Sequence, residues 1–484
     1  MFYHSTRGAG SVSAAEALLR GTAPDGGLYL PDVLPNCADL LTSTLDYAGL
    51  AGRLFTRLLP GLPGEALEGL ARVAYGPQFD HPDITPLVSV GENRVLELFH
   101  GPTAAFKDLA LQALPRLMAL ARGQLDPGGR YAVLVATSGD TGPAALRGFA
   151  GLPGFTTLVY YPVEGVSPVQ RAQLLALGQG GSRAVAIRGD FDQAQAGVKA
   201  ALAQPAELLP RGLRLTSANS INIGRLVPQV VYYVAAIRQL LREGCLQSGQ
   251  LVDFIVPTGN FGDVYAGFLA RGLGLPVGRL TVACNANRVL ADFIQTGVYD
   301  RRRALKRTLS PSMDILVSSN LERLLYEACG RDAGRVKGWM DQLRSQGHYR
   351  VDADTLAFIQ RHFSAHASND AQALDAMRRV HQRHGYLLDP HTAAAWLAAQ
   401  AQPPSCRPRV VLATASPFKF PEAALRALGQ PVPGDGRALL SALARASGMP
   451  VPAALSGLEA DWGMEERVID SAALVADAMG RVAT

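Results

Sequence analysis

The sequence predicts an α/β fold built around a mostly parallel sheet. Short apolar runs, rich in Val, Ile, Leu and aromatic residues, alternate with helical patterns, and several of these runs end in polar, glycine-rich turns. This alternation is typical of βαβ units. In open α/β sheets, ligands bind beyond the carboxyl ends of the strands. The predicted strands are 131–137, 156–162, 184–189, 251–257, 280–284 and 409–414.

Length and composition indicate more than one domain. The chain has 484 residues, of which 48% are hydrophobic, and that is too long for one compact core. The first 95 residues or so show weaker strand signals and more Leu, Gly and Pro turns. We therefore expect a separate N-terminal segment over residues 1–95.

Charge and cysteine content restrict the class of protein. The net charge of +5 is spread along the chain, and the one dense basic run, 301–307, is typical of a solvated helix face. No basic stripe with interleaved aromatics predicts a nucleic-acid partner. Five scattered cysteines without a CxxC pair favour reduced thiols in a cytoplasmic protein. The apolar run 226–241 contains Gln229 and Arg238, so it predicts a buried helix rather than a membrane span.

A lysine at the end of an apolar stretch is the first candidate for chemistry. Residues 100–108 read HGPTAAFKD and place Lys107 directly after a phenylalanine. Lysine is usually a solvated surface charge, but burial disfavours its charged form. A lysine amine that loses its proton near neutral pH can form a Schiff base with an aldehyde.

Two predicted strands run into turns that suit an anion. The turn ATSGDTG follows the strand at 131–137 and places hydroxyls and a carboxylate around two glycines before a helix. The turn PTGNFGD follows the strand at 251–257 and predicts a nest of backbone amides for a phosphate. An ordinary helix cap is the favoured explanation of the first turn when it is taken alone, and two glycines in five residues weaken that explanation for the second turn without removing it. The candidate residues are Thr137, Ser138, Asp140, Thr141, Gly259, Asn260, Phe261, Gly262 and Asp263.

Two further turns add a cation each. SANSINIGR at 217–225 packs amides and a hydroxyl before Arg225, and arginine is the preferred fork for phosphate or carboxylate. ATASPFKFP at 413–421 places Thr414 at a strand end and Lys419 between two phenylalanines, where a lysine can simply extend its charge to water. Together the four turns predict a site for two anionic groups and a small polar molecule. The candidates from these two turns are Asn219, Ser220, Asn222, Arg225, Thr414 and Lys419.

The combination of lysine, amide nest and hydroxyl indicates pyridoxal 5′-phosphate. That cofactor needs a lysine for its aldehyde, a cradle for its phosphate and a partner for its ring nitrogen. A metal site is not expected, because the histidine pairs 362/366 and 381/384 lack the acidic or thiol ligands of known patterns. No nucleophile elbow of a serine hydrolase is present either.

These motifs together resemble the threonine synthase family. HGPTAAFKD, ATSGDTG, SANSINIGR, PTGNFGD and TASPFKFP occur in order, and YHSTRG, APDGGLYLP, SPSMDILVSSNLERLL and GYLLDPHTAAA extend the similarity over nearly the whole chain. The resemblance implies the tryptophan-synthase-β-like fold (fold type II). Residues 96–484 would then form a pyridoxal-phosphate-dependent catalytic region of two interleaved α/β subdomains, the smaller at roughly 100–215, after the N-terminal extension.

The resemblance also implies a role for each motif. Lys107 would be the Schiff-base lysine, residues 259–263 would hold the cofactor phosphate, and Thr414 would face the ring nitrogen. The turn at 137–141 would bind the substrate α-carboxylate through Thr137, Ser138, Asp140 and Thr141. Asn219, Ser220, Asn222, Arg225 and Lys419 would bind the substrate phosphate.

The implied reaction is that of a lyase acting on a phosphate ester. O-phospho-L-homoserine would lose phosphate from Cγ and gain water at Cβ to give L-threonine, with Lys107 moving protons at Cα and Cβ. A phospho-lyase on the same scaffold, which would release 2-oxobutyrate, and a non-catalytic binding protein of this fold are the alternatives. The expected partner is the small-molecule substrate alone, without nucleic acid or membrane, for a monomer or homodimer.

Overall fold

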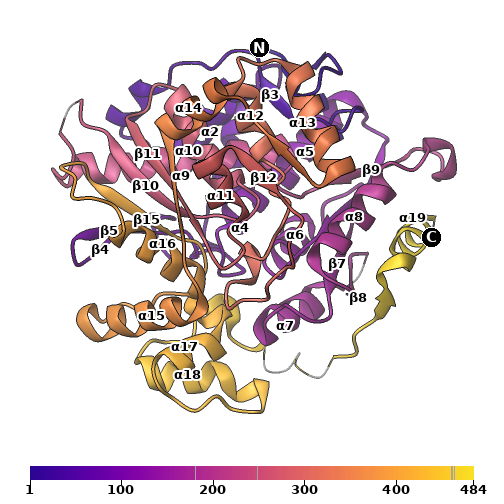
Figure 1. Cartoon of the computed structure of the whole chain (residues 1–484). Helices are drawn as coiled ribbons and strands as arrows, with labels where there is room; N and C mark the ends of the chain where they lie inside the picture. Colours follow the sequence, from indigo (N-terminus) through magenta and orange to yellow (C-terminus); the bar gives the residue numbers. More distant parts are fainter. Residues whose placement is uncertain (180, 248, 459–461, 463, 484) are drawn as a thin grey trace.

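Two largely parallel sheets organise the chain, as the alternating pattern predicts. The computed structural model describes residues 1–179, 181–247, 249–458, 462 and 464–483. One sheet has five parallel strands in the order β16-β8-β7-β6-β9, and the other has six in the order β14-β11-β10-β15-β5-β4 (Figure 1). In the six-stranded sheet β4 and β5 pair antiparallel and the other neighbours are parallel.

All six strands expected from apolar runs are present. They are β6 (Arg130–Ala136), β7 (Phe155–Pro162), β8 (Arg183–Arg188), β10 (Val252–Pro257), β11 (Val277–Cys284) and β15 (Arg409–Ala413). The strands that were not predicted are β4 (Leu87–Val90), β5 (Asn93–Glu97), β9 (Leu213–Ser217), β14 (Phe363–Ala367) and β16 (Val468–Asp470). These missed strands are short, and most of them have partly exposed residues, so they lack a continuous apolar run.

The first part of the chain forms a small sheet of its own but shares the main core. Strands β1 (Tyr3–Ser5), β2 (Ser11–Val12) and β3 (Tyr29–Pro31) pair antiparallel, and α1 (Ala14–Arg20), α2 (Tyr47–Leu58) and α3 (Gly64–Ala74) follow. Their apolar residues belong to the same core cluster as those of α9. The domain limits at 95 and at roughly 100–215 stay predictions.

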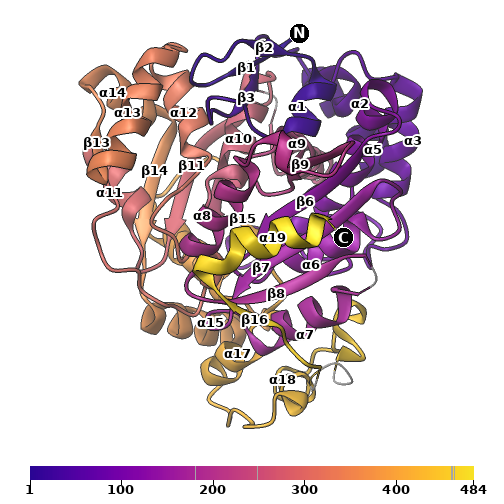
Figure 2. The same cartoon turned by 90° about the vertical axis from the view of Figure 1, so that its right-hand side faces the viewer.

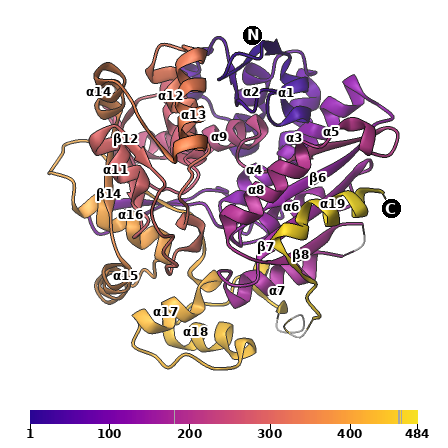
Figure 3. The ribbon, with the colours of Figure 1, turned by 45° about the vertical axis from the view of Figure 1, so that its right-hand side comes forward.

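Helix α9 (Ile223–Arg242) is the central helix, and almost every residue along it is buried. Figure 3 shows α9 and α4 (Lys107–Leu111) between two groups of elements, with β7, β8 and α19 on one side and α11–α14 on the other. The expectation of a buried helix at 226–241 is confirmed. Across the described residues, no helix has the length and apolar character that a bilayer crossing requires.

The remaining helices pack on the sheets or on one another. They are α5 (Leu114–Leu125), α6 (Thr141–Phe149), α7 (Pro168–Leu177), α8 (Phe191–Leu202), α10 (Gly262–Gly272), α11 (Val289–Thr296), α12 (Leu321–Ala328), α13 (Ala333–Gln346), α14 (Ala353–His362), α15 (Asp370–His384), α16 (Pro390–Gln400), α17 (Pro421–Ala427), α18 (Leu439–Ser447) and α19 (Leu474–Ala483). Near the C-terminus, β16 joins the outer edge of the five-stranded sheet and α19 packs on α8 (Figure 2). The basic run 301–307 is exposed, as expected, but it is irregular rather than helical.

A buried arginine ties the N-terminal segment to the two loops that follow β9 and β10. The Arg323 side chain is fully buried on α12, and it donates to the backbone oxygens of Tyr29 (3.2 Å) and Ile221 (2.7 Å) and to the Asn320 side chain. Asn320 in turn donates to the Asn260 backbone oxygen at 2.9 Å. Three segments distant in sequence therefore depend on one guanidinium.

Replacing that guanidinium should destabilise the chain. Arg323→Met leaves three buried acceptors without a donor, and we expect the free energy of unfolding to fall by about 3 kcal/mol. Urea unfolding followed by circular dichroism measures the change, with Arg344→Met as control because the Arg344 side chain is 79% exposed. Equal unfolding midpoints for the two variants would contradict the proposed tie.

Candidate active site

One pocket collects residues from all the turns that the sequence singled out. The carboxyl ends of β6, β9, β10 and β15 meet there, as expected for an open α/β architecture. The predicted residues that line it are Lys107, Ser138, Asp140, Thr141, Asn219, Ser220, Arg225, Gly259, Asn260, Phe261, Gly262, Asp263 and Thr414. The predicted residues that do not line it are Thr137, Asn222 and Lys419.

Lys107 is the first residue of α4, and the residues just before it pair with the backbone that follows β15. The Phe106 amide donates to the Thr414 backbone oxygen at 2.8 Å, and Ala105 forms a bridge with Ala415. Backbone pairing therefore places Lys107 and Thr414 in the same pocket. The Lys107 ammonium lies 4.2 Å from the centre of the Phe106 ring.

The environment of Lys107 makes its amine easier to deprotonate than that of an ordinary lysine. Its side chain is 13% exposed, and burial lowers its pKa to about 8, with the cations Arg225 and Lys419 acting in the same direction. Asp140 opposes them, since its Oδ2 lies 3.6 Å from the Lys107 Nζ. The balance leaves an amine that can lose its proton near neutral pH, as its position in the sequence predicts.

Asp140 stays ionised in this pocket. Burial alone would raise its pKa, but Lys419 and Lys107 together hold the pKa well below its usual range. Its two oxygens also accept from Gln170 Nε2 at 2.8 Å and Ser312 Oγ at 3.0 Å. The carboxylate is thus a fixed negative charge beside the Lys107 amine.

Lys419 stands behind Asp140 rather than on the pocket wall. It is fully buried, and its Nζ lies within 3.0 Å of the Thr103 backbone oxygen, Gln173 Oε1 and Asp140 Oδ1. An ammonium has three hydrogens, and these three oxygens use them. A direct contact of Lys419 with a substrate phosphate stays a prediction. In the structure, the Lys419 ammonium binds Asp140 and two other oxygens behind the pocket wall.

Thr137 and Asn222 lie outside the pocket wall, and their side chains bind backbone groups of their own turns. Thr137 Oγ1 accepts from the amides of Gly139 and Gly142, both at 3.0 Å, which closes the turn before α6. Asn222 is the cap of α9, and its amide donates to the backbone oxygens of Leu18 and Ser217. Substrate contacts of these two residues stay predictions.

The loop 259–263 has the form of an amide nest. The Gly259 carbonyl accepts from Ser318 Oγ at 2.7 Å, and the Asn260 carbonyl accepts from Asn320. A peptide N–H points away from its own C=O, so the amides of residues 260 and 261 point the other way. Phe261 has a left-handed backbone (φ 63°), and a Cβ on Gly259 would lie 2.4 Å from the Ser312 oxygen. The loop geometry therefore requires glycine at 259.

Asp263 and Arg225 carry buried polar atoms without a partner among the described residues. Asp263 Oδ1 accepts from Tyr232 (2.6 Å) and Tyr233 (3.1 Å), while its Oδ2 has no donor, and burial raises its pKa to about 6. Arg225 donates from Nη1 to the Ala218 oxygen at 2.9 Å, but its Nε has no acceptor. Burial lowers the Arg225 pKa to about 10, so a buried cation without a carboxylate partner in the described chain faces the pocket.

Several pocket residues were not singled out from the sequence. They are Phe106, Ala136, Phe191, Gln229, Pro257, Thr258, Ser312, Met313 and His391. The sequence feature that could have pointed to His391 is the segment DPHT at 389–392, because an aspartate directly before a proline is typical of the start of a helix. Nothing in the histidine spacing points to it.

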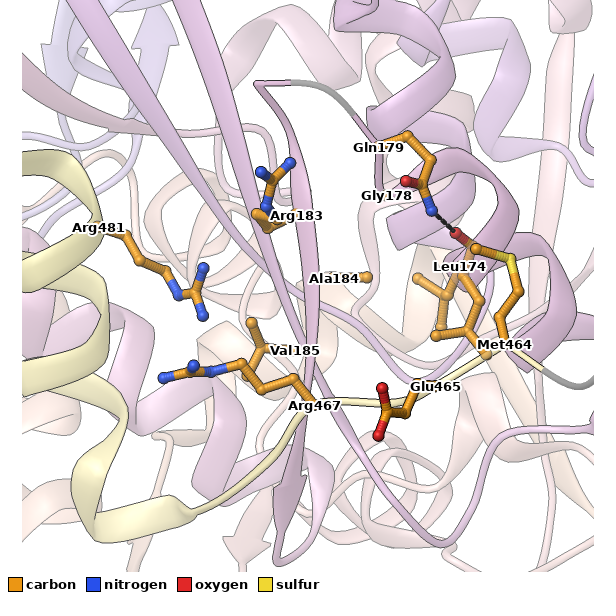
Figure 4. Close-up of a pocket in the computed structure, with 11 residues that line it drawn as sticks. Leu174, Gly178, Gln179, Arg183, Ala184, Val185, Met464, Glu465, Arg467 and Arg481 are labelled. Carbon is orange, nitrogen blue, oxygen red and sulfur yellow. Dashed lines mark hydrogen bonds between the residues drawn. The ribbon is translucent and has the colours of Figure 1, made fainter. Parts of the chain in front are cut away.

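A second hollow lies at the outer edge of the five-stranded sheet and is separate from the candidate site. Figure 4 shows Arg183 on β8, Arg467 before β16 and Arg481 on α19 around it. Arg467 and Arg481 both form ion pairs with Asp477. None of the site residues predicted from the sequence lines this hollow.

The comparisons with known proteins agree with the motifs. Residues 85–416 match the family described as "Pyridoxal-phosphate dependent enzyme", residues 2–75 match "Threonine synthase N terminus" and residues 392–477 match "Threonine synthase, C-terminal". The threonine synthase of Pseudomonas aeruginosa is 41% identical over 444 residues, which cover 89% of this chain and 91% of that protein. The chain belongs to the threonine synthase family.

Solved structures of family members have the same fold. The pyridoxal-phosphate-bound threonine synthase from Brucella melitensis is 37% identical with a TM-score of 0.84 over 100% of both chains. The yeast threonine synthase is 29% identical with a TM-score of 0.83, covering 99% of this chain and 98% of that chain. The family resemblance and the fold type II architecture inferred from the motifs are both confirmed.

Some relatives are longer than this chain. The human protein named threonine synthase-like 1 is 37% identical over 433 residues, and the match covers 86% of this chain but 58% of that protein. The corresponding protein of Macaca fascicularis is also matched over 58% of its length. Membership of the family is therefore shared by proteins of different overall size.

The buried amine of Lys107 should lower the stability of the cofactor-free chain. Because its folded-state pKa of about 8 lies below the ordinary lysine value, the unfolded chain binds more protons between about pH 8 and pH 10.4, and stability rises with pH there. Lys107→Met should therefore be more stable than the unsubstituted chain at pH 7, by a margin that shrinks toward pH 10. Urea unfolding at both pH values measures the margin, and a constant margin would contradict the lowered pKa.

Proposed function

We propose that the chain is a threonine synthase, which converts O-phospho-L-homoserine and water to L-threonine and phosphate with pyridoxal 5′-phosphate as cofactor. The observation that carries the proposal is the meeting in one pocket of a buried lysine amine, an amide nest and a buried arginine that has no carboxylate partner among the described residues. The family members named threonine synthase, one of them solved with pyridoxal phosphate bound, support it.

The residues present fit the cofactor. Lys107 supplies the amine for its aldehyde, the amides of 259–263 suit its phosphate, and Thr414 lies in the same pocket with its backbone tied to the segment of Lys107. Asp263 Oδ2 and Arg225 Nε are buried without a partner in the described part of the chain, as expected of a pocket that binds a polar ligand. When bound, pyridoxal phosphate supplies an electron sink for carbanions at the substrate carbons.

The other turns are proposed to hold the substrate. Ser138, Asp140 and Thr141, with the turn that Thr137 closes, would surround the α-carboxylate near the start of α6, where helix amides favour an anion. Asn219, Ser220 and Arg225 line the wall proposed for the substrate phosphate. Asn222 and Lys419 would act with them from their places behind the wall.

Lys107 is proposed to move the protons. An amine with a pKa of about 8 can both accept and donate a proton near neutral pH, which suits transfers at Cα and Cβ. Asp140, 3.6 Å away, holds the amine in place without competing for the proton, since Lys419 keeps the carboxylate ionised. Arg225 would offset the charge that grows on the departing phosphate.

The proposed setting is that of a small-molecule enzyme in the cytoplasm, as a monomer or homodimer. The test of the reaction is incubation with O-phospho-L-homoserine followed by identification of all products. Threonine and phosphate in equal amounts support the proposal. Release of 2-oxobutyrate and ammonia in place of threonine would make the chain a phospho-lyase, and no turnover by the cofactor-loaded chain would indicate a binding protein.

Removal of the lysine amine should abolish turnover. Lys107→Ala takes away both the attachment point of the cofactor and the proton carrier, so we expect loss of the visible absorbance of bound cofactor and a fall in turnover of several orders of magnitude. Phosphate release and the absorbance spectrum measure the two effects. Near-normal turnover in this variant would refute the assignment of Lys107.

Arg225 should act on the substrate phosphate rather than on the cofactor. Charge-assisted hydrogen bonds to an anion contribute ~1.5–3 kcal/mol each, so Arg225→Ala should lower turnover of O-phospho-L-homoserine roughly ten- to hundred-fold. Cofactor absorbance should stay near normal. Arg225→Lys should restore only part of the loss, because a point charge cannot supply the two-pronged contact.

The paired measurement decides which phosphate Arg225 serves. Cofactor occupancy is followed by absorbance, and phosphate release is followed at varied substrate concentration. Arg225 and Asp263 have a common neighbour in Tyr232, so the amide nest lies close enough for the alternative to be tested. Loss of cofactor with an unchanged response to substrate would move Arg225 to the cofactor phosphate.

A further inference from the structure

Asp140 has a lysine on each side, and the two lysines lie at different distances from it. Lys419 Nζ is 3.0 Å from Asp140 Oδ1, which is within the range of a hydrogen bond. Lys107 Nζ is 3.6 Å from Asp140 Oδ2, which is too long for one. Because opposite charges attract, a further contact must keep the carboxylate from closing on Lys107.

The hydroxyl of Ser312 supplies that contact. Ser312 Oγ lies 3.0 Å from Asp140 Oδ2 and must be the donor, because the carboxylate is ionised. Among the described residues it is the one hydrogen-bond donor to this oxygen. The other oxygen, Oδ1, is held by Gln170 Nε2 at 2.8 Å and by Lys419. With Oδ1 held in this way, the direction of Oδ2 depends on Ser312.

The backbone of Ser312 gives its hydroxyl a defined place. The Ser312 amide donates to His391 Nε2 at 3.3 Å, and His391 Nδ1 lies 2.8 Å from the buried Asp389 carboxylate. The Ser312 carbonyl lies so close to Gly259 that a Cβ on the glycine would come within 2.4 Å of it. The residue is therefore held by α16 through its amide, and it packs on the amide nest through its carbonyl.

A buried aspartate two residues further on anchors the same segment. Asp314 Oδ1 accepts from Asn285 Nδ2 (2.7 Å), Asn287 Nδ2 (2.9 Å) and Thr308 Oγ1 (2.8 Å), and its Oδ2 accepts from the Thr308 amide at 2.9 Å. The two asparagines follow β11, so these bonds tie the segment to the six-stranded sheet. The serine hydroxyl thus reaches from that sheet to the turn 137–141 at the end of a strand of the other sheet.

We propose that the Ser312 hydroxyl is a positioning group that holds Asp140 Oδ2 back from Lys107 and so leaves the Lys107 amine free to give up and take a proton. This role rests on the proposed function, in which Lys107 carries the cofactor and moves protons. Ser312 acts through Asp140 and needs no contact with the substrate. Without the hydroxyl, the carboxylate would turn toward the amine, and the gap of 3.6 Å would close to a charge-assisted hydrogen bond.

The charges around Lys107 give the direction of the effect. An opposite charge favours the ionised form of a lysine, so a closer Asp140 raises the Lys107 pKa above its value of about 8. The other charged or titratable groups around the pair are Arg225 on α9, Asp263 on α10, Lys419 after β15 and His391 on α16. In the described chain the Ser312 hydroxyl binds Asp140 and none of these four side chains. Its removal should therefore act on Lys107 through Asp140.

The first test is the titration of Lys107 in the full-length chain without cofactor. Acetic anhydride in trace amounts reacts with the neutral amine, and mass spectrometry of the peptide that contains Lys107 gives the rate at each pH. We expect a midpoint near pH 8 for the unsubstituted chain and a midpoint about one pH unit higher for Ser312→Ala. Ser312→Thr keeps a hydroxyl and should keep the lower midpoint.

Turnover by the cofactor-loaded enzyme gives a second readout. A pKa higher by one unit lowers the neutral fraction of an amine about ten-fold at pH 7, so Ser312→Ala should form threonine about ten-fold more slowly there. The deficit should shrink to about two-fold at pH 9, where more of the amine is neutral. A general loss of packing would instead lower turnover by the same factor at both pH values.

A matched serine variant controls both measurements. Ser345→Ala removes an exposed hydroxyl on α13 and should change neither readout, and circular dichroism checks that each variant is folded. Equal midpoints for Ser312→Ala and the unsubstituted chain would overturn the positioning role, because the carboxylate would then keep its place without the hydroxyl. A turnover deficit of the same size at pH 7 and pH 9 would overturn it as well.

The positioning role and the proposed function fail separately. The Lys107 midpoint is measured without cofactor or substrate, so a chain that makes 2-oxobutyrate, or releases no phosphate, refutes the proposed function and leaves the shift between variants intact. A midpoint of the unsubstituted chain near the ordinary lysine value of about 10.4 would refute the positioning role instead, since the hydroxyl would then have no lowered pKa to maintain.

Discussion

The burial of two lysines and one carboxylate in a single cluster is the constraint on which the site depends. Asp140 lies between Lys107 and Lys419, and it also collects hydrogen bonds from Gln170 and Ser312. Buried charges are costly unless they are paired and fully hydrogen-bonded. Lys419 has three oxygens within 3.0 Å, whereas Lys107 has Asp140 Oδ2 at 3.6 Å, and burial lowers the Lys107 pKa to about 8. Both lysines keep Asp140 ionised, while the Lys107 amine can lose its proton at a pH close to neutral.

The fold could be predicted where its strands are buried on both faces. Runs such as 131–136 and 254–257 are continuous apolar stretches because helices cover both sides of them. Strands β9 and β14 were missed, because their partly exposed residues break the apolar run, and tertiary pairing rather than local pattern makes them strands. The basic run 301–307 was wrongly expected to be helical, since charge patterning reports solvent exposure and not backbone conformation.

The candidate site was predictable to the extent that its residues stand in turns after strands. Lys107 was identified as a lysine at the end of an apolar stretch, Arg225 as an arginine after a polar turn, and the loop 259–263 as a glycine-rich turn after a strand. The structure brings all three into one pocket. Thr137 and Asn222 are the same residue types, yet they bind backbone groups behind the wall, and sequence cannot separate a cap from a ligand contact. His391 was missed for a related reason. Its aspartate is visible as a helix cap, but its meeting with Ser312 and Asp140 depends on chain segments 79 residues apart and more.

A site with this much buried charge needs a rigid frame, and the frame is built from neighbours distant in sequence. Arg323 connects the N-terminal segment, the start of α9 and, through Asn320, the amide nest. Helix α9 carries Arg225 at its start and supplies Tyr232 and Tyr233 to Asp263 further along. A shift of one of these elements would therefore disturb the cation and the nest together. Such a frame is needed because catalytic groups act only when they are held close to the productive geometry.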